Sequence, residues 1–106
     1  MQLQKLVECF LLDVCAGKVN ETPKAYRTKL QHLINFLGSE REYFDQGDID
    51  NFRVYLLSRK TIHRGGLEVK SGLSPFTIRS VLATTQHFLR WCGGHGYLPA
   101  GLEIRN

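Results

Sequence analysis

The sequence predicts an all-α domain, a bundle of four helices joined by short connections. Four segments place apolar residues three and four positions apart, the spacing that gathers them on one face of a helix. Glycines, or hydroxyl and acidic residues that cap helices, separate these segments. At 106 residues, with 42% of them apolar, the chain has the length and composition of one globular domain with a single core.

The first two helices are expected near the N-terminus. Apolar spacing predicts a helix over residues 2–16, ended by Gly17. The second is expected to begin at Thr22, whose hydroxyl can accept a hydrogen bond from a free amide, and Pro23, which fits the first turn. Gly38 is expected to end it.

The other two helices also carry start signals. Asp45 is an N-cap for a third helix, which should run to about Ser58 or Arg59. Ser74, a hydroxyl cap followed by proline, starts a fourth that should end at a pair of glycines, Gly93 and Gly94. The third helix is expected to bury Ile49, Phe52, Tyr55, Leu56 and Leu57. The fourth is expected to bury Ile78, Val81, Leu82, Thr85, Leu89 and Cys92, with Phe88 at the edge.

The segment 60–73 is the least helical part. Gly65-Gly66 would suit the two-residue turn of a hairpin, but an isolated pair of short strands is marginally stable, so we favour a flexible basic loop. Residues after Gly94 are expected to form a short turn and a tail.

Charge is segregated along the chain, whose net charge is +4. Residues 22–38 hold three basic residues and no acidic one, and residues 59–102 hold six basic residues against Glu68 alone. Five of the ten acids lie within residues 40–50. Such segregation suits a polyanionic partner. An ordinary solvated surface explains the same charges equally well.

Helical wheels place the basic residues on particular surfaces, because the outward faces of the second and fourth helices are polar and lack carboxylates. Lys24, Arg27, Thr28, Gln31 and Asn35 share the outward face of the second helix, and Arg79, Ala83, Gln86 and Arg90 that of the fourth, with Ser80 and His87 at its margin. These residue types hydrogen-bond phosphates and base edges, and a small alanine permits close approach.

Three stretches together resemble the N-terminal core-binding domain of tyrosine recombinases and phage integrases. They are "TPKAYRTKLQHLINFL", then "DIDNFRVYLLSR", then "GLSPFTIRSVLATTQHFLRWCGGHGYL". The resemblance spans residues 3–100, nearly the whole chain. Two departures are the length of the 60–73 segment and the tail "LPAGLEIRN", which lacks the Asn-Pro that often follows in the family.

The resemblance implies a SAM-like orthogonal bundle of four to five helices, built as two crossed helical hairpins, that forms half of a clamp around double-stranded DNA. Residues 1–100 would be the DNA-binding domain and residues 101–106 the start of a linker to a catalytic domain of the same parent protein, with multimers assembling on DNA. The residues it places at DNA are Lys24, Arg27, Thr28, Gln31, Ser74, Thr77, Arg79, Ser80, Ala83, His87 and Arg90, and the helical wheel adds Gln86.

Catalysis is not expected from this chain, because the family's catalytic residues belong to the other domain. The letters HFLR, from His87 to Arg90, fit the family's H-x-x-R pair only formally, on a helix of the binding domain. Cys9, Cys15 and Cys92 lack metal-ligand spacing, so we expect reduced thiols in a cytoplasmic protein, with no metal and no cofactor.

Two further expectations concern partners. No apolar run reaches the roughly 18 residues of a membrane span, so no membrane partner is expected. Leu12 is a candidate for an apolar contact with a neighbouring subunit. The alternative function is a helical protein-interaction domain whose basic faces meet an acidic protein partner.

Overall fold

The computed structural model describes residues 1–14, 22–59, 63–64, 67–68 and 72–105. Its helices are α1 (Leu3–Val14), α2 (Thr22–Leu37), α3 (Gln46–Ser58) and α4 (Pro75–Gly94), which confirms the predicted all-α class. Residues 15 and 16, expected to extend the first helix, lie outside the described residues. Among the described helices, none is both long and apolar enough to cross a membrane.

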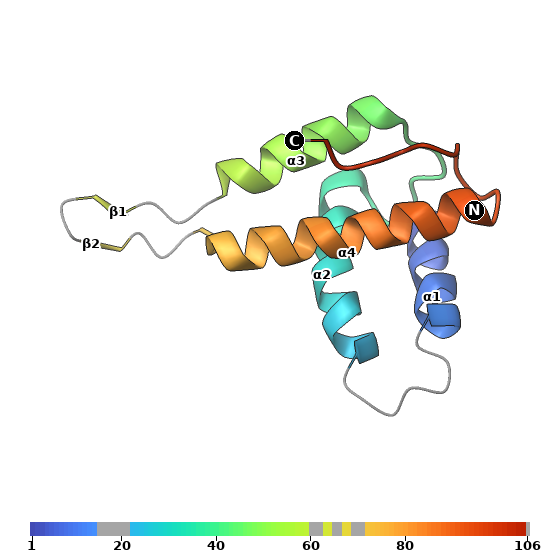
Figure 1. The fold of residues 1–106 in the computed structure, drawn as a ribbon, viewed down its shortest axis with the longest axis horizontal. Helices are drawn as coiled ribbons and strands as arrows, with labels where there is room; N and C mark the ends of the chain where they lie inside the picture. The colour runs from blue at the N-terminus through green and yellow to red at the C-terminus, as the bar shows by residue number, and fades with distance from the viewer. Residues whose placement is uncertain (15–21, 60–62, 65–66, 69–71, 106) are drawn as a thin grey trace.

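The helices form two layers that cross. Figure 1 shows α1 and α2 side by side, with α4 lying across both and α3 running beside α4. α1 contacts α2 and α3 contacts α4, as expected for two helical hairpins. α2 and α4 each contact the other three helices, so their crossing is the centre of the bundle.

Side chains satisfy the free amides at two helix starts, as the sequence predicts. Asp45 accepts a hydrogen bond from the amide of Asp48 at 3.1 Å, and the Asp48 carboxylate accepts one from the Asp45 amide at 3.0 Å, forming a reciprocal capping box. Ser74 caps α4 by accepting from the amide of Thr77 at 3.1 Å. Gly38 follows α2 with φ of 101°, the left-handed conformation that favours glycine at a helix end.

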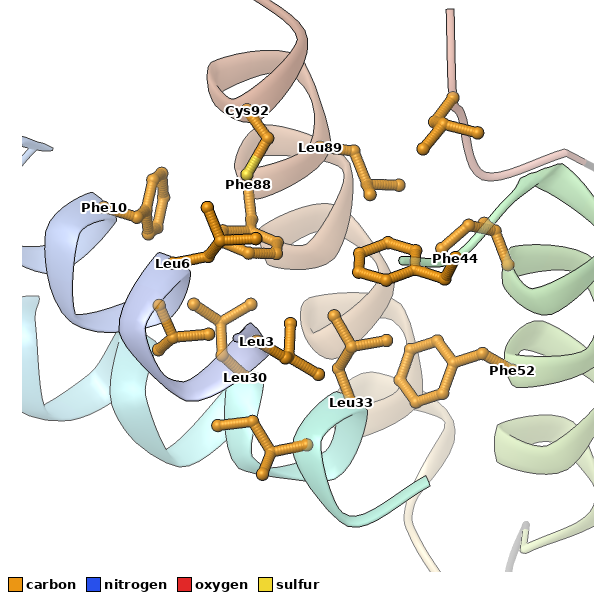
Figure 2. Packing of buried hydrophobic residues seen from close by; sticks show 14 of the residues in the cluster. Leu3, Leu6, Phe10, Leu30, Leu33, Phe44, Phe52, Phe88, Leu89 and Cys92 are labelled. Atoms are coloured by element: carbon orange, nitrogen blue, oxygen red, sulfur yellow. The ribbon is translucent and has the colours of Figure 1, made fainter. Parts of the chain in front are cut away.

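The core lies where the two layers meet. Its largest fully buried side chains are Phe10, Phe44, Phe52, Phe88, Leu3, Leu6, Leu30, Leu33, Ile49, Leu56, Leu89 and Val7, several of which Figure 2 shows packed together. Phe88 was expected at the edge of the α4 stripe, but it is completely buried because Phe10 packs edge-on against it. The prediction for Leu57 was wrong, since it is 42% exposed. Leu82 is half-buried.

Residues 63–64 and 67–68 correct the preferred interpretation of the 60–73 segment, which was a flexible loop. Two short strands, β1 (His63–Arg64) and β2 (Leu67–Glu68), pair antiparallel with His63 opposite Glu68. The hairpin alternative is therefore the one that the structure bears out, although its proposed turn, 65–66, lies outside the described residues. Next to the strands, the amide of Leu73 donates a hydrogen bond to the carbonyl of Arg59, and this bond joins the end of α3 to the start of α4.

The C-terminal segment is more ordered than the expected tail. Leu98 and Leu102 are buried, and Gln46 of α3 both donates to and accepts from the backbone of Glu103, at 2.8 and 3.1 Å. The amide of Ile104 donates to the side-chain oxygen of Gln86 on α4 at 2.6 Å. Residues that were expected to begin a linker therefore pack between α3 and α4.

Candidate nucleic-acid interface

The outward face of α2 carries the polar residues that the wheel predicts. Lys24, Arg27, Thr28 and Gln31 are all exposed. The hydroxyl of Thr28 donates to the carbonyl of Lys24 at 3.0 Å, and Gln31 donates to the side chain of Asn35 at 2.9 Å. The face is thus exposed but internally hydrogen-bonded, so its amides and hydroxyls must exchange partners to contact a ligand.

Arg27 is the cation of this face that already has an acidic partner. Both of its terminal nitrogens donate to the two carboxylate oxygens of Glu8 on α1, in a bidentate pair. The hydrogen bond from Arg27 lowers the pKa of Glu8, and the same bond raises the pKa of Arg27. α2 itself lacks carboxylates over this face, yet the fold brings one to it from α1.

Some of the predicted α4 residues lie on the side of the helix opposite the core, and others lie at the two edges of that side, which we call its flanks. Arg79, Ala83, His87 and Arg90 are exposed and lie opposite the buried stripe of Val81, Phe88 and neighbours, while Thr77 and Ser80 are half-buried. Within the described residues, neither Arg79 nor Arg90 forms an ion pair. The outward side of α4 therefore offers unneutralised guanidinium groups beside a small alanine.

The flanks of α4 face different neighbours. The ring of His87 meets Phe10 of α1 edge-on, with ring centroids 5.2 Å apart, so one flank faces α1 and α2. Gln86 accepts the hydrogen bond of Ile104, and together with Arg90 it lines a hollow of about 290 Å³ against the C-terminal segment. The structure thus turns Gln86 toward the C-terminal segment, whereas Arg90 borders the same hollow but remains exposed.

The start of α4 is less open to an anion than its sequence suggests. The oxygen of Ser74 accepts from the amide of Thr77, and the two hydroxyls also share a hydrogen bond of 2.9 Å. The cap therefore already occupies one of the amides that a phosphate would use. Thr77 still lies at the flank that faces α2.

The crossing of α2 and α4 brings three predicted site residues together. A hollow of about 390 Å³ lies between the helices and is lined by Lys24, Ala25, Thr28, Lys29, His32, Thr77 and Val81. We call it the α2–α4 hollow. Two lysines and a histidine are among its lining residues, and none of the described residues that line it carries a carboxylate.

A second hollow adjoins the first along α2. It measures about 410 Å³ and is lined by Arg27, Thr28, Gln31, His32 and Asn35. Thr28 and His32 line both hollows, so the two adjoin along α2. Of the twelve predicted residues, Lys24, Arg27, Thr28, Gln31 and Thr77 therefore share one surface, and the others extend along α4 or face away.

Sequence reasoning missed Ala25, Lys29 and His32 at the α2–α4 hollow. Lys29 lies beside the apolar stripe of α2, so a wheel of α2 alone does not assign it to an outward face. His32 follows Thr28 by four residues, a spacing that shares a face and so was a usable signal. Burial, and secondarily the charge of Arg59, lower the pKa of His32.

The acidic residues of α3 have partners outside α2. Asp48 receives a hydrogen bond from Arg41 at 3.1 Å, and Asp50 lies 3.9 Å from Arg105 at the C-terminal segment. Among the described residues, no three His, Cys, Asp or Glu side chains come together as a metal would require. The α2 surface and the acidic start of α3 are therefore separate regions of opposite charge.

No protein-family model matches the chain, and searches of curated proteins and of solved structures found no match either. The resemblance to the core-binding domain of tyrosine recombinases therefore rests on the residues quoted above alone.

Proposed function

We propose that this domain binds duplex DNA through α2 and the outward side of α4, as the DNA-binding part of a site-specific tyrosine recombinase or integrase. The observation that carries the proposal is the α2–α4 hollow, which is lined by Lys24, Lys29 and His32 and, among the described residues, by no carboxylate. Phosphate oxygens are the natural counterpart of such a cluster, since they accept hydrogen bonds from ammonium groups.

The α4 face extends the same surface with chemistry that suits a DNA groove. Arg79 is exposed, and Ala83 one turn later leaves room for close approach of a duplex. Guanidinium groups bind either phosphates or the acceptor edge of guanine. The recombinase assignment adds that strand cleavage belongs to a catalytic domain of the same parent protein, with copies of the protein assembling on DNA.

The proposal is tested by fluorescence anisotropy of a labelled duplex titrated with this domain at several salt concentrations. We expect binding that weakens steeply with salt, because each phosphate contact releases condensed counterions. If the anisotropy did not change as protein is added, even at low salt, the proposal would be wrong.

A matched pair of variants separates this surface from net charge. Lys24→Gln removes a lysine that lines the hollow, and Lys5→Gln removes an exposed lysine of α1 that lines neither α2 hollow. We expect only Lys24→Gln to lower the affinity clearly. Equal losses in the two variants would mean that the duplex responds to net charge and not to this surface.

A further inference from the structure

We propose that the α2–α4 hollow seats one backbone phosphate of the duplex and that His32 takes up a proton when the phosphate binds. The inference rests on the proposed function and deepens it, because it names one contact and makes that contact sensitive to pH. It also assigns roles to Lys29 and His32, which neither helical wheels nor the resemblance single out.

The hollow has the donors that a phosphate requires. Lys24 and Lys29 each carry an ammonium group with three hydrogens, and His32 can donate from a ring nitrogen. The hydroxyl of Thr28 already donates to a backbone carbonyl. That of Thr77 shares its hydrogen bond with Ser74. The two lysines and the histidine are therefore the principal donors, and the threonines form the wall.

Among the described residues, the charged side chains that line the two hollows with His32 are cations, one of which is paired with Glu8. From α2, Lys24 and Lys29 share the first hollow with it, and Arg27, paired with Glu8, shares the second. Arg59, at the end of α3, also acts on the imidazole, whereas the lining residues from α4 are uncharged. Burial and Arg59 lower the pKa of His32, so the free domain holds it neutral at physiological pH.

A bound phosphate reverses this balance. An anion next to the ring favours the charged imidazolium, so the pKa of His32 rises on binding. Protonation and DNA binding then favour each other reciprocally. Between the raised pKa of the complex and the lowered pKa of the free domain, affinity increases as pH falls, by at most about tenfold per pH unit for one proton.

The test is isothermal titration calorimetry of the domain with duplex DNA, in two buffers of different ionisation enthalpy, at pH 8 and near pH 6.5. We expect proton uptake near pH 6.5, seen as a binding enthalpy that depends on the buffer, and much less at pH 8. His32→Gln keeps a hydrogen-bond donor that cannot titrate, so it should bind at pH 8 and lose the uptake.

His95→Gln is the matched control. His95 is exposed beyond the end of α4, where it stacks on Trp91 and lies 3.9 Å from Asp13, and it does not line the hollow. We expect this variant to retain the proton uptake of the original protein. Loss of the uptake in His95→Gln and its persistence in His32→Gln would overturn the inference.

Lys29→Gln provides a second test that does not need His32 to be replaced. It should reduce the dependence of log affinity on log salt by about 0.9, the value for one phosphate contact. If the salt dependence of the affinity were unchanged in Lys29→Gln, the proposed phosphate contact at the hollow would be refuted. If the unmodified domain fails to bind at either pH, the proposed function itself fails. Binding without proton uptake would refute the phosphate contact of His32 and leave the proposed DNA binding unaffected.

Discussion

Removing the two exposed arginines of α4 together should weaken DNA binding without unfolding the protein. Arg79 and Arg90 are exposed, and within the described residues neither forms an ion pair. Exposed substitutions of this kind cost within about 0.5 kcal/mol each. We therefore expect the double variant Arg79→Gln, Arg90→Gln to melt within about 4 °C of the original protein.

The effect on binding follows from counting phosphates. If each arginine contacts one phosphate, the slope of log affinity against log salt falls by about 1.8 in the double variant. Between 50 and 200 mM salt, the original domain should then lose about twelvefold more affinity than the variant loses. Fluorescence anisotropy with a labelled duplex measures both slopes directly.

The matched control removes two cations from other surfaces. Lys5 lies on α1 and Arg53 on α3, and neither lines the hollows of α2. The double variant Lys5→Gln, Arg53→Gln has the same net charge and should keep nearly the original slope. Equal slopes in the two double variants would refute the assigned face, and a much lower melting temperature for the α4 variant would show that its arginines are structural.

Three other substitutions or treatments give separate outcomes. Glu8→Gln should release Arg27 and raise DNA affinity in the anisotropy assay. It should lower the free energy of unfolding by less than about 1 kcal/mol, because the ion pair is partly exposed. Since the pKa of Glu8 is lowered, the contribution of the pair to stability is lost as pH falls through that pKa. Ser74→Ala should lower the free energy of unfolding by about 1 kcal/mol in urea denaturation, because it removes the α4 cap; an unchanged midpoint would contradict that role. Burial raises the pKa of Cys92 to about 12, so iodoacetamide at pH 8 should label Cys9 well before Cys92. Mass spectrometry of the peptides measures both labelling rates, and equal rates in the folded protein would contradict the burial of Cys92.

The sequence was sufficient to predict the helices, because each one carries its own signals. Asp45 and Ser74 cap the helices that they were expected to cap, and apolar spacing identified most of the core. Leu57 shows the limit of that method. The α3 stripe of Ile49, Phe52 and Leu56 is covered by the bundle, but Leu57 lies beyond the covered side, which only the position of α3 determines.

The candidate site was less predictable, because it depends on which helices meet. Wheels placed Lys24 and Thr28 on an outward face, yet they could not reveal that Lys29 turns toward α4 at the crossing. Nor could they reveal that Glu8, 19 residues away, pairs with Arg27. Gln86 was assigned to the DNA face by spacing alone, and the packed C-terminal segment occupies it instead.

The central claim, that α2 and α4 form the DNA-binding surface, is tested most directly by NMR. Labelled protein is titrated with a short duplex while its backbone amide signals are followed. We expect the largest signal changes over residues 24–35 and 77–90, and small ones over α3, whose first turn is acidic. Changes concentrated on α3, or none at low salt, would contradict the account.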